Sequence, residues 1–428
     1  MALRRSHPVA IAAAAVAFLA TVAALTVLNG RPSLPQAAGG SPAAGRSSAE
    51  RIRALEAEVR RRPERTAAYD LLGEAYLQRA RETGNSVLQG RAERAFELAL
   101  GRNPRDAAAL TGMGAVAASR HDFLTALDYG RRARLAAPHV VRPYGVVIDS
   151  LIELGRYREA GRALQRMVDL KPNLASYARV SYYRQLHGDL AGAVAAMSSA
   201  ASAGGEAPEQ VAYVQTLTGD LQLERGDTHA ATAAFRLALA RLPGYVDARF
   251  GLGRAEVRTG NLAAARRRLA GVVADRPDAD HLALLAEVEL RLGRHGRARR
   301  NLARARATEA AALRAGARPD AGAVLLEADH GSAARAVRLG RRMWRAAPSV
   351  TSADALGWAL TRAGRPVEGL AYSRRALALG SRYASFHYHA AVAARAAGRP
   401  AITRRHLTRA REIDPAFSLP SGTRAGRA

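Results

Sequence analysis

The chain has 428 residues, of which 48% are apolar and 24% charged, and it contains no cysteine. That length suits two or three compact domains or one long repeat array. The absence of cysteine excludes a disulfide framework, a thiolate zinc site and a cysteine nucleophile. The net charge of +28 resembles that of a nucleic-acid-binding protein. However, Lys171 is the only lysine, and an arginine-rich, alanine-rich composition is also typical of a GC-rich bacterial genome.

Residues 1–30 have the pattern of a membrane-targeting segment. Arg4 and Arg5 precede twenty residues without a charge, Val9 to Leu28. Twenty helical residues span about 30 Å, the thickness of a bilayer core, and this run is longer than the apolar region of a secretory signal. The sequence therefore predicts a signal-anchor, with a cleaved signal peptide as the alternative. The arginines in front of it predict that the rest of the chain lies outside the cytoplasm, tethered to the cell membrane or secreted after cleavage.

Residues 31–50 are rich in Pro, Gly, Ser and Ala, which predicts a flexible linker. After it, prolines recur at a fixed spacing, because Pro104, Pro138 and Pro172 lie 34 residues apart. The same residues return between the prolines. One unit, for example, contains Leu72-Gly73 and then Ala92, Phe96 and Ala99. A fixed period in this range predicts a solenoid that extends over residues 51–416. A basic tail, residues 417–428, follows it.

The repeated residues resemble the tetratricopeptide repeat (TPR), whose pattern is W-x2-L-G-x2-Y, then A-x3-F, then P. The resemblance implies an all-α, right-handed superhelix of about ten helix-turn-helix units. In each unit, small residues let helix A approach helix B, the aromatic residue fills the space before the next unit, and the proline ends helix B. Extra residues near Arg81 to Ser86 are expected between the two helices of their unit or as extensions of them, and those from Ala307 to Gly316 are expected to extend the preceding helix.

Two patterns with possible chemistry are better explained by packing. Gly112-x-Gly114-x-x-Ala117 matches a dinucleotide-binding motif, but it falls inside a helix A and lacks the strand that such a site needs. His387 and His389 are two residues apart and so lie on different sides of a helix, whereas metal ligation from one helix needs a spacing of four. The other histidines, His281 among them, are mostly expected at solvated turns. We therefore predict no catalytic residue, metal or cofactor, and no enzymatic activity.

In TPR proteins helix A lines the concave groove and helix B mainly faces outward. This frame predicts an acidic groove in units one to five, opposed only by Arg142, while the later units mix acids with arginines. The runs of arginine fall on helix B and predict a convex basic stripe. The candidate partner-binding residues of the groove are Asp70, Glu74, Asp149, Glu153, Tyr182, Tyr213, Asp220, Glu224 and Trp358.

The resemblance and the charge pattern together predict a membrane-tethered, extracytoplasmic scaffold that binds a protein or peptide in its groove. The acidic half of the groove favours a basic partner. The alternative is binding of a polyanion or of anionic lipid through the convex arginine stripe. A location outside the cytoplasm argues against nucleic acid.

Overall fold

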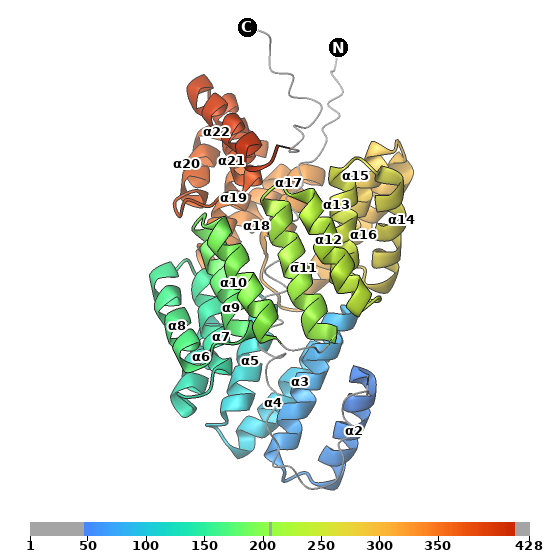
Figure 1. Cartoon of the computed structure of the whole chain (residues 1–428), viewed down its shortest axis with the longest axis vertical. Coiled ribbons are helices and arrows are strands. Elements are labelled where there is room, and N and C mark those ends of the chain that lie inside the picture. Colours follow the sequence, from blue (N-terminus) through green and yellow to red (C-terminus); the bar gives the residue numbers. More distant parts are fainter. Residues whose placement is uncertain (1–46, 205–207, 416–428) are drawn as a thin grey trace. The chain divides into compact units, whose positions relative to one another are not determined.

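The computed structural model describes residues 47–204 and 208–415. Within these ranges every regular element is an α-helix, and a single helix, α2, precedes ten helix pairs (Figure 1). This confirms the predicted all-α array of about ten TPR-type units. The predicted signal-anchor, most of the linker and the basic tail lie outside the described residues. No helix of the described ranges is long and apolar enough to cross a membrane.

The chain folds as two compact lobes that are divided within α9, between Arg179 and Val180. Among the described residues, the amino-terminal lobe comprises 47–179 and 316–318, and the carboxy-terminal lobe comprises 180–204, 208–315 and 319–415. The helices of the amino-terminal lobe are α2 (Ser48–Arg61), α3 (Thr66–Thr83), α4 (Ser86–Arg102), α5 (Ala107–Ser119), α6 (Phe123–Ala136), α7 (Arg142–Glu153), α8 (Tyr157–Leu170) and the start of α9 (Leu174–Leu186). Those of the carboxy-terminal lobe are the rest of α9, α10 (Leu190–Ala203), α11 (Pro208–Glu224), α12 (Thr228–Arg241), α13 (Val246–Arg258), α14 (Leu262–Asp275), α15 (Ala279–Arg291), α16 (His295–Arg314), α17 (Ala321–His330), α18 (Ala333–Ala346), α19 (Val350–Arg362), α20 (Pro366–Ala376), α21 (Ala384–Ala396) and α22 (Pro400–Ile413).

A phenylalanine held between two glycines joins neighbouring repeats of the amino-terminal lobe. Phe96, on α4, is fully buried. A Cβ added at Gly73 of α3 would lie 2.5 Å from the Phe96 ring, and one added at Gly112 of α5 would lie 2.3 Å from it. Real Cβ atoms do not approach so closely, so the ring fits only because both positions lack a side chain. The aromatic residue therefore fixes the spacing of three helices.

The same arrangement recurs in the carboxy-terminal lobe. Phe235 of α12 is fully buried, and Cβ atoms at Gly219 and Gly251 would lie 2.5 and 2.3 Å from its ring. The structure thus confirms that the aromatic position fills the space between one unit and the next. It also confirms that Gly112 belongs to a packed helix and not to a strand-to-helix turn.

Left-handed residues follow the first helix of every pair except α17 (Ala321–His330), after which Gly331 has φ −124°. Gly155, after α7, has φ +69°, and Gly226, after α11, has φ +80°; glycine adopts this conformation without steric cost. In the second pair His121 occupies this position with φ +58°. The extra residues of the sequence lengthen helices as predicted, since α3 runs to Thr83 and α16 runs to Arg314.

Candidate functional site

The odd-numbered helices α3 to α21 form the inner row of each lobe. Helix α19 has eleven buried residues out of thirteen, whereas its partner α20 has four out of eleven. In the amino-terminal lobe, Arg142 of α7 reaches Glu74 of α3 across the intervening α5, with 2.6 Å between Nη2 and Oε1. A side chain can bridge two helices separated by a third only on the concave side of the row, where the helices converge. We call this inward surface of the odd-numbered helices the groove.

Two arginines neutralise two of the predicted acids in the amino-terminal lobe. Arg142 pairs with Glu74, and Arg179 of α9 holds Asp149 of α7 through two hydrogen bonds, from Nε to Oδ1 (2.8 Å) and from Nη2 to Oδ2 (2.7 Å). Arg179 is fully buried. A buried guanidinium and carboxylate repay their desolvation only in such a paired, hydrogen-bonded geometry. Both pairs therefore belong to the packing between repeats.

The two other predicted acids of this lobe have no such partner. Asp70 is 7% exposed, and its Oδ1 is buried without a hydrogen bond. Glu153 is 8% exposed and lies four residues after Asp149, on the same face of α7. Burial, supported by neighbouring carboxylates, raises the pKa of Asp70 to about 7 and that of Glu153 to about 8. Both side chains are thus neutral for a large part of the time near pH 7.

In the carboxy-terminal lobe Asp220 and Glu224 of α11 share one arginine. Arg254 of α13 donates from Nη1 to Asp220 Oδ1 at 2.8 Å, and its Nη2 lies 4.0 Å from Glu224 Oε1. Burial raises the pKa of Asp220 to about 6 and that of Glu224 to about 7, against the opposing effect of Arg254. An aspartate paired with the next inner helix and followed four residues later by a second acid therefore occurs in both lobes.

Trp358 is part of a polar network along α17, α19 and α21. Its Nε1 donates to Asp329 Oδ1 at 2.8 Å, and its ring stacks on His389 with the centroids 4.4 Å apart. The Nδ1 of His389 lies 2.9 Å from Asp354 Oδ2. His389 is 1% exposed and Trp358 is 6% exposed. The histidine is therefore structural, as predicted, and most of the tryptophan ring contributes to the packing.

The predicted tyrosine anchors are also packed within the array. Tyr182 of α9 is 4% exposed and Tyr213 of α11 is 1% exposed. Like Trp358, they offer little ring surface to a partner, because their side chains fill the layer between helices. Their direct contact with a partner remains a prediction. Among the predicted groove residues, the unpaired carboxylates are the ones that can still bind a charged group of a partner.

The sequence reasoning missed Arg179. It expected only Arg142 to oppose the acids of units one to five, whereas Arg179 also pairs with one of them, Asp149, through two hydrogen bonds. Unit four lacks the usual Leu-Gly signature, so its residues were harder to place in the repeat. Arg179 is the sixth residue of α9, and its side chain is fully buried.

The histidines of α21 and α22 form a pair and not a metal cluster. His387 Nδ1 and His406 Nδ1 lie 3.0 Å apart. Burial, together with the other ring, lowers the pKa of His387 to about 4, so both rings are neutral near pH 7 and one donates to the other. In the described ranges no three His, Asp or Glu side chains are placed to hold a metal ion. The expectation of a solvated turn was wrong for His281, which is 3% exposed and packs against Phe250.

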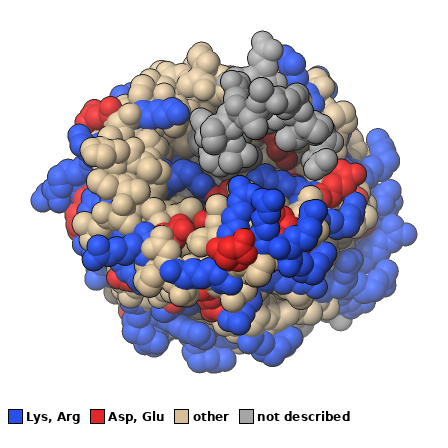
Figure 2. Space-filling model, turned by 90° about the horizontal axis from the view of Figure 1, so that it is seen from below, with Lys and Arg blue, Asp and Glu red and all other residues tan. Residues whose placement is uncertain are grey.

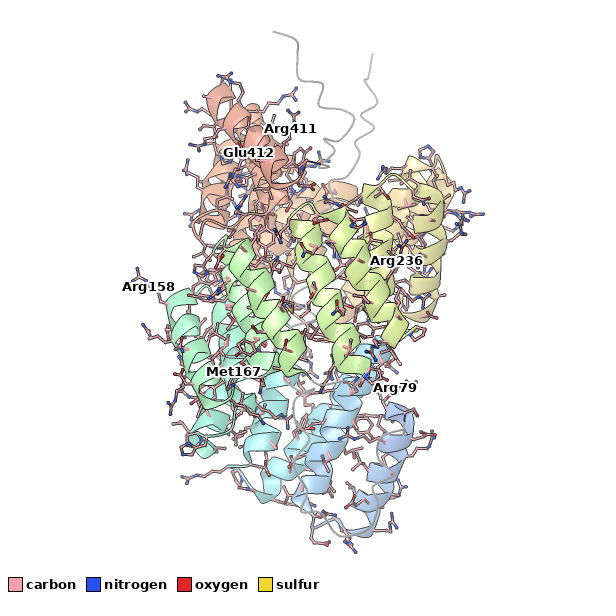
Figure 3. The ribbon with its side chains drawn as sticks, viewed as in Figure 1. Arg79, Arg158, Met167, Arg236, Arg411 and Glu412 are labelled. Atoms are coloured by element: carbon pink, nitrogen blue, oxygen red, sulfur yellow. The ribbon has the colours of Figure 1, made fainter. Side chains whose placement is uncertain are left out.

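The even-numbered helices carry their arginines on the outer side. On α8, Arg158 is exposed and extends away from the helix, whereas Met167 is buried (Figure 3). On α16, Arg297, Arg300 and Arg304 are all exposed, and they lie on one face at three- and four-residue spacing. On the face seen in Figure 2, Lys and Arg side chains dominate the outside and Asp and Glu form smaller patches among them.

A tetratricopeptide repeat model matches residues 222–288, which run from the end of α11 to α15. No curated protein sequence matches the chain. Among solved structures, a TPR protein of Thermus thermophilus is 21% identical, with 40% of this chain and 92% of that chain covered and a TM-score of 0.37. A TPR protein of Parabacteroides merdae is 15% identical (59% and 98% covered, TM-score 0.42). The type IV pilus biogenesis factor PilW is 17% identical (49% and 97% covered, TM-score 0.40). These values describe a similarity of fold.

Proposed function

We propose that the chain is a binding scaffold, and not an enzyme, whose groove holds a protein or peptide partner. The observation that carries the proposal is the row of carboxylates on the inner helices. Placing a carboxylate where it is poorly solvated costs free energy unless a cation or hydrogen bonds compensate it. Within the described residues, Asp70 Oδ1 is buried without a hydrogen bond, and the one cation that lowers the Asp70 pKa, Arg142, is paired with Glu74. No cation of the described ranges lowers the pKa of Glu153. Among these residues neither carboxylate forms an ion pair that stabilises the array, so we attribute both to the binding of a ligand.

The partner of this groove is a basic protein segment. The acids of the groove outnumber the arginines that pair with them in the amino-terminal lobe, while the outer faces are basic. Where Asp70 and Glu153 are ionised, a cationic segment is therefore attracted inward, and an anionic one is held at the outer faces. The test is a binding screen with the full chain in detergent, using peptides that alternate Arg or Glu with Ala. Binding of the Glu peptide in the groove, identified by protection of α3 and α7 from hydrogen exchange, would refute the assignment.

The residues before the array tether it to the cell membrane, with the repeats outside the cytoplasm. Support for this part comes from the uncharged run Val9 to Leu28 behind Arg4 and Arg5. Fractionation of cells that express the full chain tests it. An anchored chain stays in the membrane pellet after carbonate washing and is digested by protease added outside. Recovery of a shortened chain in the medium would instead establish secretion after signal cleavage.

A second candidate function is the binding of anionic lipid through the outer arginines of α16. Arg297, Arg299, Arg300 and Arg304 are exposed and make no ion pair within the described residues. The only acid on this helix is Glu309. Flotation with vesicles of 30% phosphatidylserine, at low and at physiological salt, tests this function. Because a surface electrostatic attraction is screened by salt, retention should fall between the two conditions, and equal retention on neutral vesicles would exclude it.

A further inference from the structure

Among the described residues, two buried carboxylates of the amino-terminal lobe form no salt bridge although arginines lie close by. Arg142 is held by Glu74, and Arg179 is held by Asp149. Asp70 is four residues before Glu74, and Glu153 is four residues after Asp149, so each unpaired acid lies one helical turn from a paired one. The same arrangement therefore occurs twice in the lobe: a carboxylate paired with arginine lies next to a carboxylate without an ion pair. We call the second kind the open carboxylates.

The charges around Asp70 oppose its ionisation. After burial, the effects that raise its pKa come from Asp106 at the start of α5 and from Glu74 on the same helix, and only Arg142 of α7 lowers it. Helices α2 and α4 contribute no charged group that shifts this pKa. Arg142 pairs with Glu74, and its electrostatic effect on the Asp70 pKa is smaller than the opposing effect of burial.

The surroundings of Glu153 are poorer still in positive charge. Burial has the largest effect on its pKa, and Asp149 of α7 adds to it. Helix α5 has no ionisable side chain, and no charged group of α6 or α8 shifts the Glu153 pKa. Arg179 of α9 donates two hydrogen bonds to Asp149 and another, from Nη1, to the Ala175 carbonyl. Glu153 therefore remains a buried carboxyl group at the groove without a cation.

We infer that Asp70 and Glu153 are the subsites at which basic side chains of the partner bind, and that binding displaces a proton from each carboxyl group. The inference rests on the proposed function, because it names the chemistry that the groove selects. An ammonium or guanidinium group brings the missing positive charge and hydrogen-bond donors to the carboxylate. The displaced proton leaves to the solvent, so the ligand arrives as a cation and the site becomes an ion pair.

Proton release makes the inference measurable in the full chain. An eight-residue alternating Arg–Ala peptide is titrated calorimetrically into the protein at pH 7, in phosphate and in Tris, whose ionisation enthalpies differ. The two heats give the number of protons released. With pKa values of about 8 and 7, Glu153 and Asp70 together release between one and two protons per peptide. Because fewer sites are ionised at low pH, the affinity should also fall more than tenfold from pH 8 to pH 6.

Variants assign the protons to residues. Glu153→Gln has the shape and neutrality of the protonated acid, so the variant should fold. It should release nearly one proton fewer per peptide and bind the peptide at least tenfold more weakly. Asp70→Asn should act in the same direction independently. Asp169→Asn, at an exposed acid on the outer helix α8, is the matched control and should change neither quantity.

The failure of the inference differs from the failure of the proposed function. If the peptide binds the wild-type chain without proton release, or if Glu153→Gln and Asp70→Asn bind within twofold of wild type, these residues are not its subsites and the inference is wrong. In that case a groove that binds basic peptide would still stand. If no basic peptide binds at all, both the proposed function and the inference are refuted.

Discussion

Replacement of Phe96 by alanine should unfold the amino-terminal lobe more readily than any surface change. The ring is fully buried between helices α3, α4 and α5. A Cβ atom added at either of the glycines that face it, Gly73 or Gly112, would lie within 2.5 Å of the ring. Phe→Ala in a core costs about 3–5 kcal/mol, and the cost is highest where the surroundings cannot collapse into the cavity. Gly73 and Gly112 have no side chains that could fill the space. We therefore expect a loss near the upper end of this range, about 4 kcal/mol.

Hydrogen exchange monitored by mass spectrometry is the suitable assay, because a repeat array does not unfold in one step. In Phe96→Ala, amides of α3, α4 and α5 should lose protection, while those of α17 to α19 should keep it. Leu135→Ala is the control, since Leu135 on α6 is 76% exposed and should change stability by less than about 0.5 kcal/mol. A loss below about 1.5 kcal/mol in α3 to α5, or an equal loss throughout the chain, would refute this account of the packing.

Three further predictions concern the polar groups. Arg179→Ala leaves Asp149 as an uncompensated charge and should lower the stability of α7 and α9 by about 3–5 kcal/mol, measured by hydrogen exchange. Glu153 has a pKa raised above its value in the unfolded chain, so its effect on stability is most favourable below pH 4.5 and is lost as the pH rises through about 8. Urea denaturation should therefore show lower stability at pH 9 than at pH 6, with a smaller difference in Glu153→Gln. Trp358→Phe removes the hydrogen bond to Asp329 and should cost about 1–3 kcal/mol in thermal denaturation.

The fold could be predicted from the sequence because its signals are local and repeated. The position of Phe96 in the 34-residue period already assigned its role. The ion pairs could not be predicted in the same way, since Arg179 meets Asp149 only through the packing of α9 on the preceding repeats. Burial was the second missing quantity. His281 looked like a residue of a turn, but it follows the start of α15 by two residues and packs against the neighbouring helix.

The same physics explains why the open acids, and not the paired ones, suit a ligand. A cationic side chain that competed for Asp149 would have to release Arg179, which is fully buried and bonded to it twice. Leaving that arginine without a partner costs about 3–5 kcal/mol, which is as much as one new ion pair returns. At Glu153 the ligand displaces only a proton and removes an existing penalty of burial. Asp149→Asn is therefore expected to lower the stability of the repeat array, whereas Glu153→Gln is expected to lower the affinity for the ligand.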